Sequence, residues 1–150
     1  MKTQAGRIAA TLTILALSLT TAGCQEVLAG EAARPPAVSE FGLGPRTSSK
    51  GVYTAVLEPQ EPLRVRRMQK VAVRLVDAGG RPIEDAAISI DGGMPEHSHG
   101  LPTQPRVTRS LGNGVYEIEG VRFSMGGWWE LKLAIESPAG ADSVTFNLSL

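Results

Sequence analysis

The sequence has few cysteines, few histidines and no surplus of charge, and each shortage excludes a class of protein. With one cysteine, Cys24, the chain cannot form an internal disulfide, so its fold depends on an apolar core. Lys+Arg and Asp+Glu number 15 each, and this balance lacks the basic surplus of nucleic-acid-binding proteins. The sequence also lacks a GxSxG motif and a phosphate-binding glycine loop. We therefore expect neither an enzyme nor a nucleic-acid-binding protein.

A long apolar run is missing as well. Residues 8–19 are mostly apolar and uncharged, but the run is shorter than the roughly 20 residues that span a hydrocarbon core. It follows a basic start and precedes small residues, a pattern typical of a cleaved secretory signal. Residues 21–24, Thr-Ala-Gly-Cys, resemble a bacterial lipobox, which implies cleavage before Cys24 and a lipid on its sulfur. The alternative is an ordinary signal peptide with an incidental cysteine.

We predict a lipoprotein signal peptide over residues 1–23 and lipidation at Cys24. The mature chain is then anchored to a membrane of the cell envelope and faces the periplasm or the exterior. Residues 24–50 are rich in Ala, Gly, Pro and Ser and show no sustained period of 2 or 3.6. Such a stretch buries too little apolar surface to offset the entropy lost on ordering. We expect a flexible, disordered tether there and a folded domain over residues 51–150.

From Gly51 onward, apolar and polar residues alternate with period 2, which is typical of half-buried strands. The apolar positions of residues 70–77 share one face, and the same holds for residues 129–136 and 143–150. Turn-forming Gly, Pro and Asn separate the alternating segments. About seven short strands of this kind, without an amphipathic helix, predict an all-β fold, namely an immunoglobulin-like β-sandwich.

The alternation also predicts the buried residues, because each apolar face must pack against the other sheet. The expected core residues are Val73, Leu75, Ile88, Tyr116, Ile118, Trp129, Leu131, Leu133, Phe146 and Leu148. Trp128 falls on the opposite strand face from Trp129, so we expect one of the two tryptophans to be exposed. The basic run at residues 64–67 fits a solvated strand edge, where charge discourages edge-to-edge pairing.

One segment, residues 92–103, breaks the strand pattern and contains both histidines, His97 and His99. In an extended backbone, residues two apart project to the same side, so the two imidazoles are expected to reach one metal ion. Met94 precedes them, and Met125 lies in a second interrupted segment between two predicted strands. Neutral imidazole suits copper and zinc, and thioether sulfur selects Cu(I). The alternative is that the histidines are solvated polar residues and the methionines fill gaps at the end of the sandwich.

The order and spacing of these residues resemble the YtkA-like domain of the FixH family. That family's pattern is a Met-Pro-x-His-x-His-Gly element, a Gly-x-Tyr strand and a Phe-x-Met-x-Gly-x-Trp segment that opens a long strand. The matching positions are Met94, Pro95, His97, His99, Gly100, Gly114, Tyr116, Phe123, Met125, Gly127 and Trp129. The resemblance covers about residues 52–150. It implies a small exported β-sandwich associated with copper handling and cytochrome oxidase assembly.

The residues and the resemblance predict an envelope-tethered copper-binding domain for copper delivery or buffering, with ligands from His97, His99, Met94 and Met125. The expected partners are the membrane, through the lipid anchor, and an envelope protein such as an oxidase or a copper transporter. The alternative function is a metal-free β-sandwich interaction module that docks an envelope or membrane protein. A copper titration separates the two.

Overall fold

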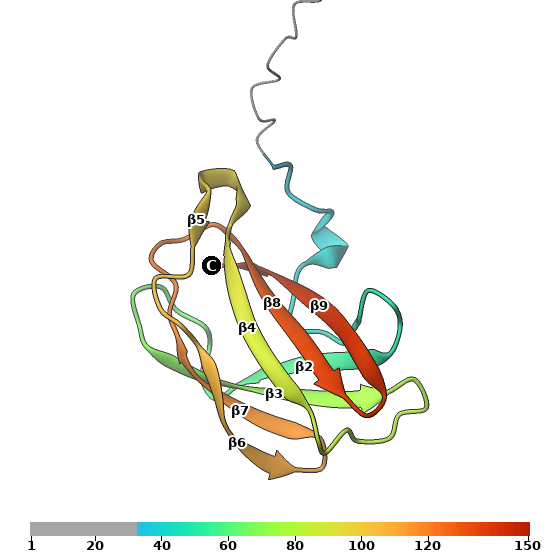
Figure 1. The fold of residues 1–150 in the computed structure, drawn as a ribbon. Helices are drawn as coiled ribbons and strands as arrows, with labels where there is room; N and C mark the ends of the chain where they lie inside the picture. The colour runs from blue at the N-terminus through green and yellow to red at the C-terminus, as the bar shows by residue number, and fades with distance from the viewer. Residues whose placement is uncertain (1–32) are drawn as a thin grey trace, which may run out of the picture. The chain divides into compact units, whose positions relative to one another are not determined.

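The computed structural model describes residues 33–150, which Figure 1 shows as a coloured ribbon. The predicted signal peptide, the lipidation site Cys24 and the first part of the predicted tether lie outside these residues. Among the described residues, no helix has the length and apolar character needed to cross a membrane.

The regular structure of the described chain consists of nine strands and two short 3-10 turns. The strands are β1 (Arg46–Thr47), β2 (Tyr53–Pro59), β3 (Gln69–Asp77), β4 (Ala87–Met94), β5 (His99–Gly100), β6 (Arg106–Gly112), β7 (Val115–Val121), β8 (Trp128–Ser137) and β9 (Gly140–Ser149). The turns are η1 (Val38–Glu40) and η2 (Pro95–His97). The all-β prediction is confirmed. The longer strands occupy the segments in which strands were expected, and the two-residue strands β1 and β5 are additional.

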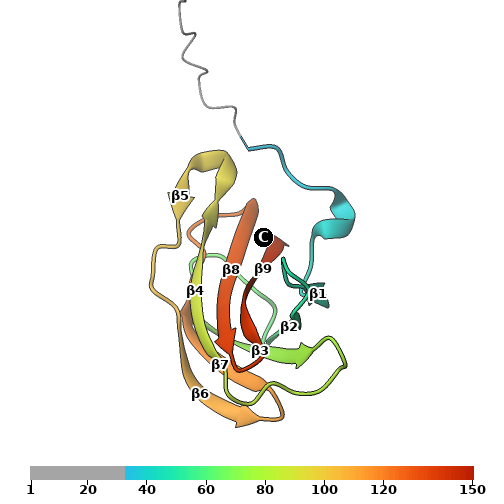
Figure 2. The ribbon, with the colours of Figure 1, turned by 45° about the vertical axis from the view of Figure 1, so that its right-hand side comes forward.

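The strands form one antiparallel sheet that folds over on itself. Their order is β1-β2-β3-β7-β6-β4-β8-β9, and β5 pairs with β4. The sheet bends into two facing groups of strands, β1-β2-β3-β7-β6 and β4-β8-β9 (Figures 1 and 2). Between β4 and β6, the two groups are joined by a single paired position, Ser89 with Arg106. The apolar faces of both groups therefore enclose one core.

Side chains alternate between the core and the surface along the central strands. In β3 and β8 every second residue is buried, as Leu75 and Leu131 illustrate. All the core residues predicted from the sequence belong to the same hydrophobic cluster, with Ile88 at its partly buried rim. The strand faces were therefore predicted correctly.

Both tryptophans are buried, so the expectation that one is exposed was wrong. Trp129 lies in the core, and Trp128 on the opposite face is only 8 % exposed. The Trp128 indole Nε1 donates to Asn147 Oδ1 in β9 at 3.0 Å. The chain around η1 contacts the same asparagine, because Asn147 Nδ2 donates to the Glu40 carbonyl at 3.5 Å. The period-2 pattern of β8 carries no information on the segment around η1.

The predicted tether extends too far along the chain, because the segment before Gly51 pairs with the sheet. Phe41 forms a parallel bridge with Asn147, and the Gly42 N–H donates to the Asn147 carbonyl at 2.9 Å. β1 then pairs with β2. The ordered domain therefore begins near Phe41. This segment lacks alternation because its backbone, and not an apolar face, makes these contacts.

A buried carboxylate fastens the turn between β1 and β2 to β9. Asp142 is 7 % exposed and accepts the Ser48 hydroxyl at 2.6 Å. The backbone N–H groups of Lys50 and Val52 donate to it at 3.0 and 3.2 Å. Burial by itself raises its pKa, but these bonds and one from the Ser143 N–H prevail and lower the pKa to about 2. The two outer strands of the sheet are thereby connected, and the domain is nearly closed.

Candidate functional site

Both histidines lie on a hairpin formed by β4 and β5, with η2 as its turn. Met94 at the end of β4 pairs with His99 in β5, and the left-handed Ser98, with φ 51°, completes the turn. The ring centroids of His97 and His99 lie 6.0 Å apart, with 27° between the ring planes. Both side chains are exposed. The hairpin projects from one end of the strands (Figure 2).

The two imidazoles are neighbours, but the backbone that brings them together is not the one expected. In the expected extended segment, alternate residues share a side. The chain instead passes through a 3-10 turn that ends at His97, and Ser98 reverses its direction before β5 begins. The expectation of an extended backbone was therefore wrong.

Two glycines allow β4 to approach its neighbours at this end. A Cβ at Gly93 would overlap the carbonyl oxygen of His99 in β5, and a Cβ at Gly92 would overlap that of Glu130 in β8. Any other residue at Gly93 would force β4 and β5 apart, and any other residue at Gly92 would force β4 and β8 apart. The glycines therefore fix the hairpin close to β8.

Met94 lies inside the domain and not at the exposed tip of the hairpin. It is 1 % exposed and belongs to the hydrophobic cluster. Its methyl carbon Cε lies against Gly127, where an added Cβ would come within 2.8 Å of it. Because Met94 and His99 are directly opposite in register, their side chains leave the hairpin on the same face. Met94 thus connects the hairpin to the segment that precedes β8.

Met125 lies in that segment, between β7 and β8, and is 39 % exposed. Its carbonyl oxygen accepts the Trp129 indole Nε1 at 3.0 Å. The Trp129 ring packs edge-on against Phe123, with centroids 5.3 Å apart. Gly127 pairs with Leu150 through two backbone hydrogen bonds of 2.8 and 3.1 Å. An ordered backbone therefore presents the Met125 side chain at the surface.

The four predicted ligand residues lie on two adjoining segments, but three are at the surface and one is in the core. His97, His99 and Met125 are exposed, whereas Met94 is buried at the contact between the hairpin and the Met125 segment. Within residues 33–150, no group of three or more His, Cys, Asp or Glu side chains is placed to hold a metal ion. The donors available at this place are imidazole and thioether, a combination that suits copper and, through sulfur, Cu(I).

A shallow hollow of about 300 Å³ lies beside the hairpin, and its charged residues could not be predicted from the sequence. Its lining is Asp91, Gly92, Gly93, Met94, Pro95, Ser98, His99, Gly100, Glu130 and Lys132. Lys132 Nζ and Glu130 Oε2 form an ion pair of 2.8 Å on β8. In the sequence these two residues are only the polar half of an alternating strand, and no pattern places them beside His99.

The family model described as YtkA-like matches residues 47–134. The matched region runs from β1 into β8 and contains the hairpin and the Met125 segment. The search of curated proteins and the search of solved structures give no match.

Proposed function

This chain belongs to the YtkA-like family, and on that premise we propose that it is a copper-binding domain of the cell envelope. The domain delivers or buffers copper, and it acts as a carrier and not as an enzyme. Its resemblance to the FixH family indicates that the copper is used in cytochrome oxidase assembly. His97 and His99 are the imidazole ligands, and Met94 and Met125 are the thioether ligands. The observation that carries the proposal is the pair of exposed imidazoles, with ring centroids 6.0 Å apart.

The separation of the rings suits a shared ion. A metal–nitrogen bond of about 2 Å places a ring centroid roughly 3 Å from the metal, so two imidazoles on one ion have centroids up to about 6 Å apart. The separation of 6.0 Å is at this limit, which corresponds to a linear pair of ligands, so the rings must approach each other when the thioethers also bind. Both side chains are exposed, so rotation about their side-chain bonds adjusts the ring nitrogens without breaking core contacts.

The methionines favour one oxidation state of copper. Thioether sulfur binds Cu(I) better than Cu(II) or zinc. Met125 is exposed, so its side chain can turn toward the hairpin without a rearrangement of the core. Met94 is buried where the hairpin meets Gly127, so its sulfur contributes from the inner side of the site. A site at the surface of the domain, with three exposed ligands, exchanges its metal readily with a partner.

We also infer that the domain is an immunoglobulin-like sandwich. The orders β2-β3-β7-β6 and β4-β8-β9 correspond to the ABED and CFG sheets of a seven-stranded immunoglobulin domain. In such a sandwich, loops and hairpins gather at the two ends of the strands. The hairpin with the histidines and the Met125 segment belong to one of these ends.

The proposed location is the surface of an envelope membrane, with the lipid on Cys24. The lipobox-like residues 21–24 support it. A lipid anchor keeps the domain within reach of a membrane-embedded partner, such as an oxidase or a copper transporter. The partner then receives or supplies the metal at the exposed hairpin.

Competition titrations with Cu(I) and Cu(II) test the copper site. The unaltered chain should bind both ions, and the double variant His97→Ala/His99→Ala should bind both at least about tenfold more weakly, because imidazole serves both oxidation states. Glu96→Gln is the matched control, since it alters the same turn and keeps both imidazoles. If the double variant binds copper as well as the unaltered chain, the site is refuted. The metal-free interaction module then becomes the function to examine.

A further inference from the structure

Exposed apolar side chains are concentrated on one side of the domain. The large hydrophobic residues with exposed side chains in the described chain are Val38, Leu43, Met68, Leu111 and Met125. Leu111 lies near the end of β6. The other four lie on the segments around the C-terminus, as the following contacts establish.

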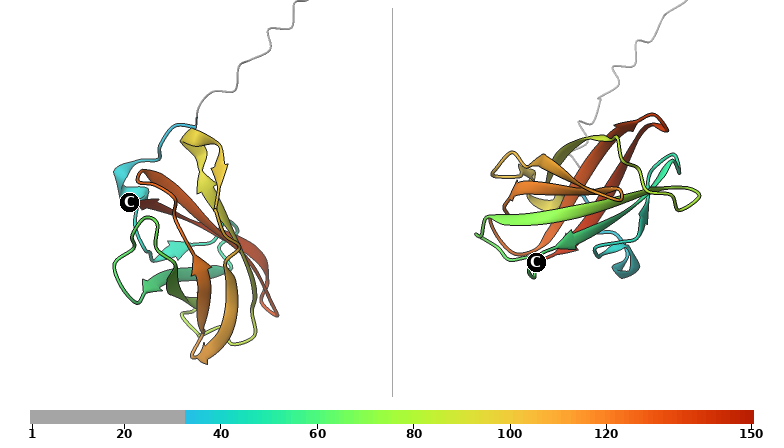
Figure 3. Two further views of the ribbon diagram at one scale, coloured as in Figure 1. Left: turned by 90° about the vertical axis from the view of Figure 1, so that its left-hand side faces the viewer. Right: turned by 90° about the horizontal axis from the view of Figure 1, so that it is seen from below.

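Three segments meet at the C-terminal residue. Leu43 shares a hollow of about 250 Å³ with Pro62, Leu63 and Leu150. Leu150 also pairs with Gly127 in the Met125 segment. The chain before β1, the loop between β2 and β3 and the C-terminus accordingly lie side by side in Figure 3. The segments that carry these four exposed residues therefore adjoin the C-terminal residue.

The loop at residues 60–68, here the arginine loop, adds positive charge to this side. The side chains of Arg64, Arg66 and Arg67 are exposed. None of the three takes part in an ion pair within residues 33–150. The run was expected at a strand edge, but the structure places it in a loop with one isolated bridge at Val65. Its charges are therefore not explained by protection of a strand edge.

The arginine loop is held in a defined conformation. Val65 bridges Phe123, and the Arg66 N–H donates to the Phe123 carbonyl at 2.7 Å. The Gln69 amide binds both backbone groups of Arg64, at 2.7 and 3.0 Å. Arg66 has a left-handed φ of 60°, which is costly for a residue other than glycine and persists only where the surroundings impose it. The loop thus presents its cations from a fixed backbone.

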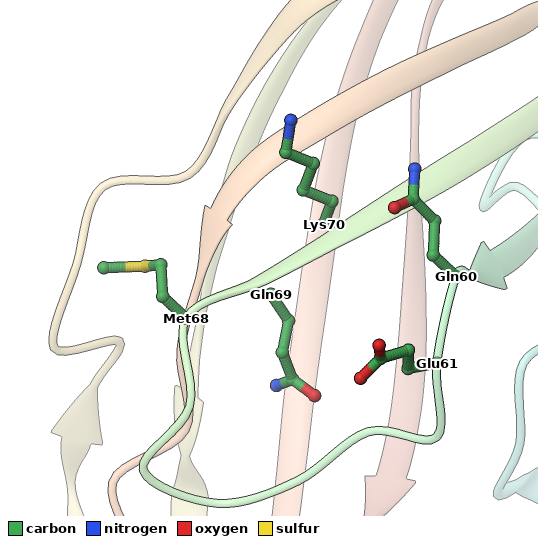
Figure 4. Close-up of a pocket in the computed structure, with 5 residues that line it drawn as sticks. All are labelled: Gln60, Glu61, Met68, Gln69 and Lys70. Atoms are coloured by element: carbon green, nitrogen blue, oxygen red, sulfur yellow. The ribbon is translucent and has the colours of Figure 1, made fainter.

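The hollow beside the arginine loop is lined by four polar residues and by Met68. Its volume is about 450 Å³, and its lining is Gln60, Glu61, Met68, Gln69 and Lys70. Figure 4 shows Met68 directed away from Gln60 and Glu61. Met68 is 64 % exposed, and Lys70 is occupied by an ion pair with Glu119 at 2.6 Å. The loop therefore carries exposed guanidinium groups and an exposed thioether side chain.

We propose that this side of the domain, formed by the arginine loop, Leu43 and Met125, docks on a bilayer that contains anionic phospholipids. Basic residues interspersed with exposed apolar chains bind at the headgroup level of such bilayers. The whole chain has equal numbers of acidic and basic residues, so the cations here are a local surplus. The described chain enters the domain beside the arginine loop. The proposal does not depend on copper.

A bilayer fits this side better than an acidic protein does. Hot spots in interfaces between proteins are enriched in Trp, Tyr and Arg, and the large exposed hydrophobic residues of the described chain include neither Trp nor Tyr. The exposed acidic residues on the neighbouring segments are Glu40, Glu61 and Glu96. Glu61 faces the inner hollow, and Arg122 adds a fourth cation beside Phe123. The outward charge therefore remains positive.

Sedimentation with vesicles tests the docking. The probe is a chain that begins at Gln25, which contains every described residue and no cysteine. It should bind vesicles of phosphatidylcholine mixed with phosphatidylglycerol, bind pure phosphatidylcholine far more weakly, and dissociate as salt is raised. The variant Arg64→Gln/Arg67→Gln should bind the mixed vesicles on the order of tenfold more weakly. Arg81→Gln/Arg106→Gln removes the same charge elsewhere and should bind as the unaltered chain does.

A spin label gives a second readout that a change in folding does not mimic. Attached at Met68→Cys, it should lose mobility when mixed vesicles are added, whereas a label at Leu111→Cys should not. Equal binding to neutral and anionic vesicles, or equal weakening by both double variants, overturns the proposal. So does an absence of vesicle binding, in which case the arginine loop is to be assigned to an acidic protein partner.

Discussion

Ser48 and Asp142 are joined by a hydrogen bond of 2.6 Å between side chains that lie 94 positions apart in the sequence. Ser48 precedes β2, and Asp142 lies near the start of β9, so the bond links the outer strands of the sheet. Tyr53 extends the same connection, because its N–H donates to the Ser48 hydroxyl at 2.8 Å. A buried carboxylate therefore contributes to the closure of the domain, beside the backbone bonds that join Gly42 and Ser49 to β9.

Replacing this carboxylate should weaken the fold. Asp142→Asn keeps the size of the side chain but loses one of the two oxygens that accept the N–H groups and the hydroxyl. We expect the midpoint of thermal unfolding at neutral pH to fall by several degrees. Asp85→Asn, at an exposed acid, is the control and should leave the midpoint unchanged. Equal midpoints for the two variants contradict the role of Asp142.

Acid should remove the stability that the ionised Asp142 side chain contributes to the fold. The folded-state pKa of Asp142 is lowered to about 2 from an ordinary value of 3.8. A lowered pKa stabilises the fold above the unfolded-state value, and that stability is lost as the pH falls from about 4 through about 2. Stability measured across this window should fall less in Asp142→Asn than in the unaltered chain. Parallel acid profiles for the two proteins contradict this assignment.

The start of the domain can be tested by truncation. A chain that begins at Phe41 should unfold at the same denaturant concentration as one that begins at Gln25. A chain that begins at Gly51 lacks β1, Ser48 and the Lys50 N–H, so it should unfold at a distinctly lower concentration. Urea titrations followed by circular dichroism compare the three. A Gly51 chain of full stability restores the later boundary.

Truncation of a core side chain should reduce the free energy of unfolding far more than truncation of an exposed side chain. Leu131 is 1 % exposed, so Leu131→Ala should reduce the free energy of unfolding by about 2–5 kcal/mol, through lost burial and the cavity that remains. The control, Leu111→Ala, removes the same atoms from a side chain that is 49 % exposed. Denaturant titrations give both values, and a similar loss in the two variants contradicts the assigned strand faces.

A side chain at Gly127 should be unfavourable, mainly because of the backbone conformation. Its φ of +127° is unfavourable for an L-residue, and a Cβ there would meet Met94 Cε at 2.8 Å. Gly127→Ala should therefore cost about 1–3 kcal/mol in backbone strain. Gly100→Ala has ordinary room, with its nearest atom at 3.9 Å, and should cost much less. The free energies of unfolding of the two variants decide the point.

The two methionines should behave differently when each is replaced by leucine. Met125→Leu should weaken Cu(I) binding and leave Cu(II) binding nearly unchanged, because thioether sulfur favours Cu(I). It should leave stability unchanged, because the side chain is 39 % exposed. Met94→Leu should weaken Cu(I) binding as well, but with a loss of stability of less than about 1.5 kcal/mol from repacking of the core. Titrations and unfolding curves on the same samples separate these effects. Unchanged Cu(I) binding in both variants removes thioethers from the proposed site.

The core could be predicted from the sequence because period-2 alternation is a direct record of which strand face is buried. Leu131 and Phe146 are buried for the reason that their spacing indicates. The segment that begins at Phe41 could not be predicted, since its contacts are mainly backbone hydrogen bonds to β2 and β9. Trp128 shows the same limit, because a segment distant in sequence covers it.

The site was predictable in part. Two histidines separated by one residue had to be near each other, and they are. The turn that places them depends on a left-handed Ser98, which hydropathy does not reveal. Burial of Met94 depends on Gly127, which is far away in the sequence. Contacts of this kind require the three-dimensional arrangement of both segments.

The hydrogen bond from the Trp129 indole to the Met125 carbonyl makes tryptophan fluorescence a probe of the Met125 segment. The protein has two tryptophans, and both stand at the start of β8, directly after the Met125 segment. The emission of an indole responds to its hydrogen bonding and to a nearby copper ion, which quenches it. Intrinsic fluorescence should therefore follow any rearrangement of the Met125 segment without an added dye.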